Sequence, residues 1–516
     1  MSTASVFAHP GVPYPPGVAV GETTSPTRAP LNAARIAKDA ALTLALVLLN
    51  LGGVPGSAIF FAILTVMVFW KPSAAYKAVL ISALGLILNE AFVPKTVVWT
   101  VARLVLPMLA CARFLIDLAA TRGGGAGGMK GTYATLMVYV FTMAACSFAS
   151  GWYTHIALLK LFNFWILMTM VFAGTAVLRR TKVDLSEWVV SQIVATAVVG
   201  VAAVATGQSR NFLVYRLRDT DIAISDSLFN GAFLHPNAHA AYASLFVIFL
   251  VSIYLFSHYR QRVLTLPLIA TWLIFMVYSQ SRTSLFATAV PLLVVLPFEA
   301  RKVVRDGRLF KSHVSRATLA AAAMVMACGL LILDVAADRV VTKQAVMFLH
   351  KWDQTETTEL NTETMLSSRQ GKIDESMANF RENPWHGIGF GVAKNDFFVQ
   401  GATLFTAPAE KGFLISAVLE EGGIFGAAAF VLFLLTMVVS LVRSHNVPAL
   451  LTLACMIVSN FGEVTLFAPG GSGTFLWMMF GLAVILGDHC WQKPLPPRTA
   501  SAPGGMRAAI APNMAA

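Results

Sequence analysis

The chain has 516 residues, of which 57% are hydrophobic and only 12% are charged, and its formal net charge is +12. Because soluble proteins average about 25% charged residues, this composition excludes an ordinary soluble domain. The positive charge could indicate nucleic-acid binding, but the basic residues lie between long apolar runs, as in the cytoplasmic loops of a membrane protein.

Apolar runs of about 20 residues, long enough to cross a bilayer, recur from Ala40 to Gly487. In hydrocarbon only helices and closed barrels satisfy their backbone polar groups, and these runs lack the alternation of barrel strands. The sequence therefore predicts an all-α fold, a polytopic membrane bundle of about 12–14 transmembrane helices. The predicted spans are 40–53, 57–70, 76–93, 97–118, 132–150, 156–177, 186–205, 237–256, 263–279, 283–298, 317–335, 411–441, 448–465 and 472–487. The first two are short and could instead pair as a re-entrant hairpin.

The two ends of the chain are rich in Pro, Ala, Gly and Ser, which is typical of disordered tails. No basic stretch followed by an apolar one opens the chain, so we expect no cleaved signal peptide. The five cysteines stand singly without metal-ligand spacing, and we expect neither a metal nor another cofactor. The expected organisation is a cytoplasmic tail (1–35), an N-terminal transmembrane bundle (36–335), a large loop with an amphipathic helix (336–410), C-terminal transmembrane helices (411–489) and a second cytoplasmic tail (490–516).

The distribution of lysine and arginine residues among the loops predicts the orientation of the protein in the membrane. With the N-terminus in the cytoplasm, the short basic loops fall on the cytoplasmic side, as the positive-inside rule requires. They are residues 71–77, 121–130, 179–182, 258–262, 299–311 and 442–446. The two longest polar loops, 207–235 and 336–410, then fall on the other side, which in a bacterium is the periplasm.

Several arginines lie on the outer side against this bias. Arg282 sits in a turn of a few residues, where an anionic ligand is the favoured explanation. Ser281 and its neighbours can cap the following helix, and a helix N-terminus beside an arginine suits a phosphate. Capping with an arginine that reaches the interface is the alternative. Arg216 and Arg218 lie in the first long loop, where charge is translocated more freely.

His235, Asn237 and His239 cluster at the start of the span that Pro236 opens. Three polar groups around one helix start suggest that they position a substrate or the adjacent loop. A purely structural role is equally compatible with the pattern.

Leu366, Arg369, Ile373, Met377 and Phe380 recur at helical spacing, which predicts an amphipathic helix in the large loop. Arg369 shares the apolar stripe, so the helix would aim it at the bundle. An inward arginine needs an anionic partner, either an internal carboxylate or, the interpretation we favour, a substrate phosphate.

A glycine run follows this helix. Gly387 and Gly389, after Asn383-Pro384, predict a tight turn that lets the backbone approach another group closely. The run is not a dinucleotide-binding loop, because no βαβ unit surrounds it and the spacing differs.

Carboxylates lie at two depths of the next span. Glu410, beside Lys411, lies at its outer edge and could act as a general base. Glu420 and Glu421 lie deeper, where a carboxylate is either functional or paired. The possible cationic partners are Arg103, Arg113 and Lys160.

In their order along the chain, these residues resemble the O-antigen ligase and Wzy-type polysaccharide polymerase superfamily of bacteria. The matching motifs are Phe-x-His-Pro-Asn (233–237), Ser-Arg-Thr-Ser (281–284), Ser-Arg (368–369), Asn-Pro-x-x-Gly-x-Gly-x-Gly (383–391) and an acidic, glycine-rich span (421–425). They cover about 200 residues of the C-terminal half.

The resemblance implies a membrane glycosyltransferase of the GT-C-like type in the bacterial inner membrane, with its site facing the periplasm. It would use neither metal nor nucleotide sugar. Its donor would be a glycan on undecaprenyl pyrophosphate, and an acceptor glycan would take the sugar through a hydroxyl. Arg282 and Arg369 would then hold the pyrophosphate, with Arg216 or Arg218 in support. Membrane lipid and a chain-length regulator are further candidate partners.

One motif departs from the pattern of the ligases. At the start of the span after the large loop, the ligases have a motif similar to Ala-His-Asn-x-x-Leu. This chain has Ala-Glu-Lys-Gly-Phe-Leu over 409–414, so Glu410 stands in place of the histidine. His386 is a nearby substitute. The departure favours a polymerase for exopolysaccharide, capsule or O-antigen over a ligase that transfers finished glycan to lipid A-core or protein. A transporter or flippase is the third reading, although no internal repeat supports it.

Overall fold

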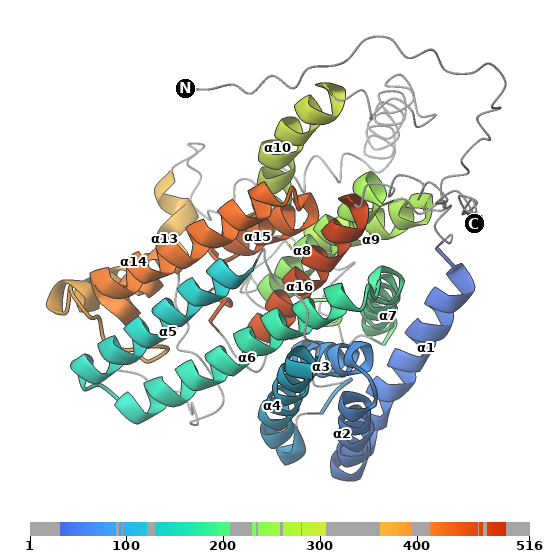
Figure 1. Ribbon diagram of the computed structural model, residues 1–516, viewed down its shortest axis with the longest axis horizontal. Helices are drawn as coiled ribbons and strands as arrows, with labels where there is room; N and C mark the ends of the chain where they lie inside the picture. The colour runs from blue at the N-terminus through green and yellow to red at the C-terminus, as the bar shows by residue number, and fades with distance from the viewer. Residues whose placement is uncertain are drawn as a thin grey trace, which may run out of the picture.

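A computed structural model of the protein describes residues 31–88, 92–94, 96–120, 129–206, 230–233, 236–257, 262–279, 281–305, 362–394, 413–462, 464–467 and 472–491. The regular elements of these residues are helices, and the described part contains no strand beyond an isolated bridge between Leu88 and Phe233. The predicted all-α class is therefore confirmed (Figure 1).

The helices follow the apolar runs of the sequence. They are α1 (Ala33–Leu49), α2 (Gly53–Trp70), α3 (Pro72–Ile87), α4 (Val97–Ala120), α5 (Lys130–Ser150), α6 (Thr154–Arg180), α7 (Ser186–Ala205), α8 (Pro236–Phe256), α9 (Thr265–Tyr278), α10 (Arg282–Arg305), α13 (Thr362–Glu382), α14 (Leu414–Arg443), α15 (Val447–Ser459) and α16 (Ser472–Trp491). Two short 3₁₀ helices are η1 (Asn50–Gly52) and η4 (Arg262–Leu264). The predicted span 317–335 lies outside the described residues.

Six helical segments of the described part are long and apolar enough to cross a membrane. They are Ala33–Trp70, Lys130–Ser150, Thr154–Arg180, Ser186–Ala205, Ala238–Phe256 and Leu414–Arg443. Five shorter apolar helices accompany them, and the structure is that of a multi-pass membrane protein. Helix α1 packs on α7, whereas α2 packs on α3 and α4, so the first two spans do not pair with each other as a hairpin.

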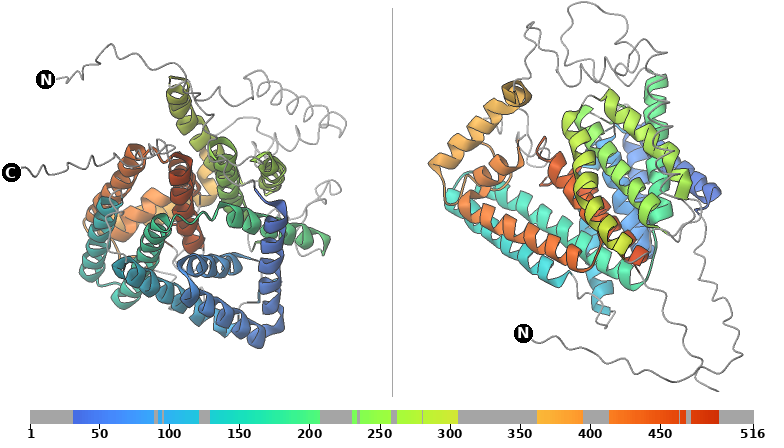
Figure 2. Two further views of the ribbon diagram at one scale, coloured as in Figure 1. Left: turned by 45° about the vertical axis from the view of Figure 1, so that its right-hand side comes forward. Right: turned by 90° about the horizontal axis from the view of Figure 1, so that it is seen from above.

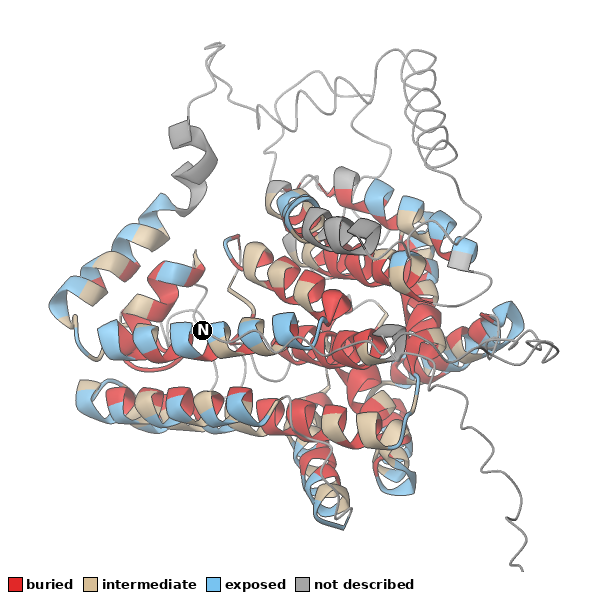
Figure 3. Cartoon of the chain, turned by 45° about the horizontal axis from the view of Figure 1, so that its top comes forward, coloured by how far each residue is buried: buried red, intermediate tan, exposed pale blue. Residues whose placement is uncertain are grey.

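Helix α16 runs through the middle of the bundle and contacts α3, α6, α8 and α15 (Figure 1). Helix α5 packs along α14, and α4 packs along α6; Figure 2 shows the bundle from two further sides. Side chains are buried towards this centre, whereas exposed positions form stripes along the outer helices (Figure 3). The exposed residues include Phe141 of α5 and Leu435 of α14, as expected where helices meet lipid.

Contacts between helix ends show which ends lie together at each of the two faces of the bundle. At one face Arg179 Nη2, at the end of α6, donates to Asp488 Oδ1 near the end of α16 at 3.1 Å. At the other face Leu88, just after α3, bridges to Phe233, just before α8. These pairings agree with the predicted topology, because each joins ends that the positive-inside rule assigns to the same side.

Candidate functional site

Helix α14 is broken in its third turn. Gly423 has φ 58° and ψ −157°, a conformation that interrupts the helix. A break leaves carbonyl groups of the first half and N–H groups of the second half without helical partners. Such groups must be satisfied inside a membrane protein, because no water is available in hydrocarbon.

The glycine-rich loop after α13 supplies the missing partners. Ile388 N donates to Glu420 O at 2.8 Å and Gly389 N to Glu421 O at 3.0 Å. In return, Ile424 N donates to Pro384 O at 2.8 Å. A second bond of this kind joins Phe425 N to Trp385 O at 3.3 Å. The loop 383–391 therefore completes the broken helix by exchanging four backbone hydrogen bonds with it.

This exchange requires glycine on both sides. Gly387 has φ 64°, and a Cβ placed there would lie 2.6 Å from the carbonyl carbon of Glu421. A Cβ at Gly423 would lie 2.5 Å from His386 N. The close backbone approach expected of the glycine run is thus present, and α14 is what the loop approaches. A substrate-binding role for Gly387 and Gly389 stays a prediction.

The loop is also held by α5 and α6. Phe390 N donates to Ser147 Oγ of α5 at 3.2 Å. Lys160 of α6 is buried, and its Nζ donates to Gly391 O at 2.6 Å. Beyond the loop, Lys394 pairs with Glu382 and lies 5.3 Å from the ring of Trp152. The segment from α13 to residue 394 is consequently anchored on three transmembrane helices.

Helix α13 docks on the first half of α14 through polar side chains. The carboxylate of Glu420, which is 2% exposed, accepts hydrogen bonds from Ser376 Oγ and Asn379 Nδ2, both at 2.7 Å. Ile373, one of the residues expected to face the bundle, is only half-buried. The predicted apolar stripe therefore missed Ser376 and Asn379, which bind Glu420. These two polar residues stand one helical turn apart on the same face of α13, and this spacing is the sequence pattern that could have predicted the polar contact.

The backbone places position 369 on this same face of α13. Seven residues separate Arg369 from Ser376, and seven residues make almost two helical turns. Arg369 therefore stands on the docking side of the helix, two turns before the contact with Glu420. The structure does not describe its side chain.

Two other helix ends lie close to the start of α14, namely the end of α15 and the start of α10. Phe413, just before α14, lies 5.3 Å from Phe461 between ring centroids, and Leu414 N donates to Asn460 O at 3.2 Å. A Cβ at Gly462 would lie 2.6 Å from Thr283 Oγ1 of α10. The starts of α10 and α14 thus meet at the end of α15.

Arg282 is the first residue of α10, so its backbone lies at this junction. Ser281 Oγ and Ser284 Oγ lie 3.0 Å apart, and Ser284 N donates to Ser281 O at 3.2 Å. The two serines thus face each other at the start of α10, and capping of a backbone N–H by a serine oxygen stays a prediction. The side chain of Arg282 is not described.

The remaining predicted site residues are distributed differently. His239 is fully buried, with its ring 5.2 Å from that of Phe233 and 5.9 Å from that of Trp272. This packing supports the structural alternative for His239. Outside the described residues lie Arg216, Arg218, His235, Glu410 and Lys411, and of Asn237 only the backbone is described.

The fold and the junction define a helical membrane protein in which α13, a helix between two apolar segments, is docked on the broken helix α14. Comparison with known families makes the class more specific. Residues 267–431 match the family model described as O-antigen ligase. The match covers about a third of the chain and runs from α9 into α14. The chain therefore carries an O-antigen ligase domain, as the resemblance of its motifs indicates. No curated protein matches the chain.

The family comprises glycosyltransferase-like enzymes that act on lipid-linked glycans. The match accordingly supports enzyme activity of this general kind and a lipid-linked oligosaccharide as the general class of substrate.

Proposed function

We propose that the protein is a Wzy-type polysaccharide polymerase. It transfers a glycan from undecaprenyl pyrophosphate to an acceptor sugar hydroxyl on the periplasmic face of the inner membrane. The observation that carries the proposal is the match of residues 267–431 to the O-antigen ligase family, because this segment contains Arg282, Arg369, Glu410 and the completed break of α14.

In the proposed reaction, an acceptor hydroxyl oxygen attacks C1 of the donor glycan while the bond from C1 to the pyrophosphate oxygen breaks. Glu410 takes the hydroxyl proton as general base. Arg282 and Arg369 bind the pyrophosphate and stabilise the negative charge that develops on it as it leaves. The step inverts C1 and needs neither a metal nor a nucleotide sugar.

The packing supports this assignment of roles. The start of α10, which carries Arg282, and the start of α14, shortly after Glu410 and Lys411 in sequence, both contact the end of α15. Helix α13, which carries Arg369, is fixed to the same helix α14 by Glu420. Residues far apart in sequence are thus attached to one framework, as a site that must hold a charged group in place requires.

A ligase is the second candidate, and the description of the matching family favours it. The substitution of Glu410 for the expected histidine favours the polymerase instead. The two activities differ in their product, because a polymerase lengthens lipid-linked glycan whereas a ligase removes finished glycan from the lipid.

The test is the glycan profile of a deletion strain complemented with the wild type, Arg282→Ala or Arg369→Ala. We expect both variants to accumulate single repeat units on lipid, with protein still present in the membrane. Arg381→Ala is a matched control, because Arg381 lies exposed in the last turn of α13. A full ladder trapped on the lipid would identify a ligase. Normal chain length in both variants would refute the assigned site.

A further inference from the structure

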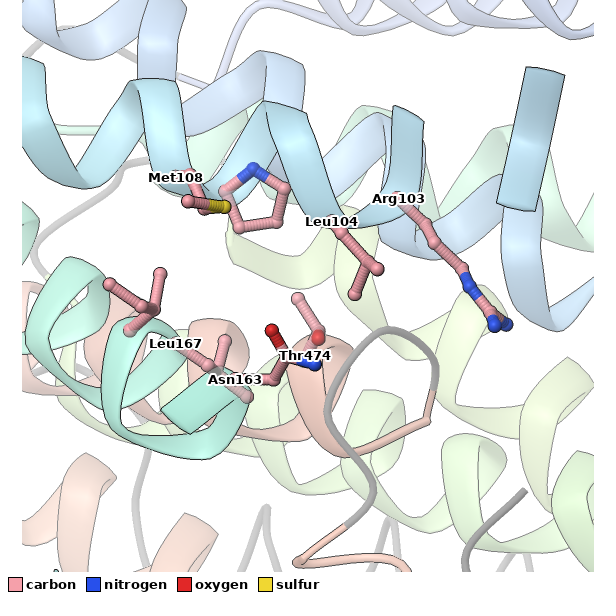
Figure 4. A pocket seen from close by; sticks show the side chains of 8 residues that line it. Arg103, Leu104, Met108, Asn163, Leu167 and Thr474 are labelled. Carbon is pink, nitrogen blue, oxygen red and sulfur yellow. The ribbon is translucent and has the colours of Figure 1, made fainter. Parts of the chain in front are cut away.

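A small space between α4, α6 and α16 is lined by Arg103, Asn163 and Thr474 (Figure 4). It encloses about 10 Å³, room for about one water molecule, so a phosphate or a sugar does not fit there. The turn that ends α15, residues 460–462, is a more informative feature, because it contacts the starts of both α10 and α14.

The backbone of this turn is fixed by Asn460, which is fully buried. Its side-chain Oδ1 accepts hydrogen bonds from Thr465 N at 2.6 Å and from Leu466 N at 2.9 Å, and its Nδ2 donates to Met456 O at 2.7 Å. Its own carbonyl oxygen accepts from Leu414 N at the start of α14. The amide therefore ties the last turn of α15 to the chain that follows it, and a shift of the turn would break several hydrogen bonds at once.

Gly462 brings this turn against the first turn of α10. A Cβ at this position would lie 2.6 Å from both Oγ1 and Cγ2 of Thr283 and 2.8 Å from its Cβ. Carbon atoms in contact are ordinarily about 3.5–4.0 Å apart, so a side chain does not fit here. Rotation of the Thr283 side chain would not relieve the clash, because its Cβ is itself too close. The approach of the two backbones thus requires glycine.

Helix α10 is also held by other contacts. Ser244 of α8 is fully buried, and its Oγ donates to Ser284 O in the first turn of α10 at 2.9 Å. Three residues further along, Ala287 packs with Ile248 of α8 in a buried cluster that includes residues of α15. A displacement of the first turn away from Gly462 would disturb these contacts as well, so the packing fixes where α10 begins.

Arg282 precedes Thr283 and is the first residue of α10. In the proposed reaction it holds the pyrophosphate. Opening the 2.6 Å separation at Gly462 to an ordinary contact would move this part of the backbone by about 1 Å. A displacement of that size in a group that positions a reactant costs on the order of 100-fold in rate.

We propose that Gly462 is a positioning residue for Arg282. By placing no side chain between α15 and α10, it sets the point from which the Arg282 side chain reaches the pyrophosphate of the lipid-linked donor. It acts through the start of α10 rather than by contact with the substrate. This inference rests on the proposed function, specifically on the role of Arg282, and applies to a polymerase and a ligase alike.

The test measures equilibrium binding of undecaprenyl pyrophosphate to the full-length protein in nanodiscs of neutral phosphatidylcholine. We expect Arg282→Ala to weaken binding at least about tenfold, the effect of one lost charged contact. Gly462→Ala should cause a loss of similar size. Gly131→Ala is the matched control and should leave the affinity unchanged, because no atom lies within 4 Å of its Cβ position at the exposed start of α5.

A double-mutant cycle distinguishes positioning from general destabilisation. If Gly462 acts through Arg282, then Gly462→Ala added to Arg282→Ala should cause no further loss of affinity. Independent effects would multiply instead, and a further loss of about tenfold in the double variant would overturn the inference. Unchanged affinity in Gly462→Ala alone would overturn it as well.

A compensating substitution covers the case in which Gly462→Ala folds poorly. Thr283→Gly removes the three atoms nearest to the added methyl group. The combination of Gly462→Ala with Thr283→Gly should therefore bind as tightly as Thr283→Gly alone and melt at the same temperature. A combination that is as stable as Thr283→Gly but binds about tenfold more weakly would refute the role of this contact.

The Arg282→Ala variant separates failure of this inference from failure of the proposed function. Unchanged binding in Arg282→Ala would refute the pyrophosphate role of that residue, and the inference with it. Weakened binding in Arg282→Ala together with unchanged binding in Gly462→Ala would refute the inference alone. The glycan ladder in cells should follow the same order, because Gly462→Ala should shorten it and the added Thr283→Gly should restore it.

Discussion

The carboxylate of Glu420 in α14 accepts a 2.7 Å hydrogen bond from Asn379 in α13, although 41 residues separate the two in sequence. With the matching bond from Ser376, this contact fixes the loop helix to the transmembrane bundle. Both carboxylate oxygens are engaged, so Glu420 serves to position α13 rather than to take a proton from substrate.

Replacement of Glu420 should destabilise the docking of α13. Glu420→Ala leaves two buried donors without a partner, which costs about 2–4 kcal/mol. We expect a lower melting temperature in detergent and faster proteolysis within α13. The double variant Glu420→Gln with Asn379→Asp should recover much of the loss, since the amide can then donate to the new carboxylate. Glu375→Gln, an exposed position on the same helix, is the control, and an unchanged melting temperature in Glu420→Ala would contradict the assignment.

Gly387→Ala should lower the free energy of unfolding, because the backbone of α14 lies close to this glycine. The residue has φ 64°, and a Cβ would press on the backbone of Glu421, so we expect a loss of at least about 2 kcal/mol in stability. Gly371→Ala is the matched control, because no atom lies within 4 Å of its Cβ position. In α13 that change should stabilise by about 0.5–1 kcal/mol. Thermal unfolding of both purified variants checks the pair, and equal effects of the two changes would count against the observed packing.

Lys160→Met should loosen the far end of the glycine-rich loop. The variant keeps most of the side-chain volume but loses the hydrogen bond to Gly391 O at 2.6 Å. Loss of a charge-assisted bond at a buried site costs about 1.5–3 kcal/mol. The melting temperature should fall, whereas Lys182→Met, at an exposed position between α6 and α7, should leave it unchanged. A fall of the same size in both variants would show that the bond contributes nothing specific.

The predicted sidedness can be checked by cysteine labelling. In a background without the native cysteines, Trp385→Cys and His445→Cys place single thiols at exposed positions at opposite faces of the bundle. An impermeant maleimide added to spheroplasts should label position 385 directly and position 445 only after permeabilisation. Reversed labelling would invert the topology and with it the periplasmic site. The mutant protein level in the membrane is the control.

Sequence reasoning located helices well where the signal is local. The span 186–205 is observed as Ser186–Ala205, and 472–487 as Ser472–Trp491. Length and apolar composition decide such segments, because a lipid-exposed backbone must satisfy its own hydrogen bonds over the width of the bilayer. The same local chemistry predicted the turn at Gly387, whose φ is 64°.

The partners of these segments were decided by the tertiary structure alone. Helical periodicity favoured an apolar inner stripe on α13, yet Ser376 and Asn379 are buried because they face Glu420. That contact lies three residues before the break at Gly423, which the glycine-rich loop completes. The hydrophobic periodicity of a helix indicates which of its faces is apolar, but it does not indicate which polar group, distant in sequence, that face contacts in the folded protein. The sequence by itself therefore determined the helices and the class of protein, and three-dimensional packing decided how the candidate site is held together.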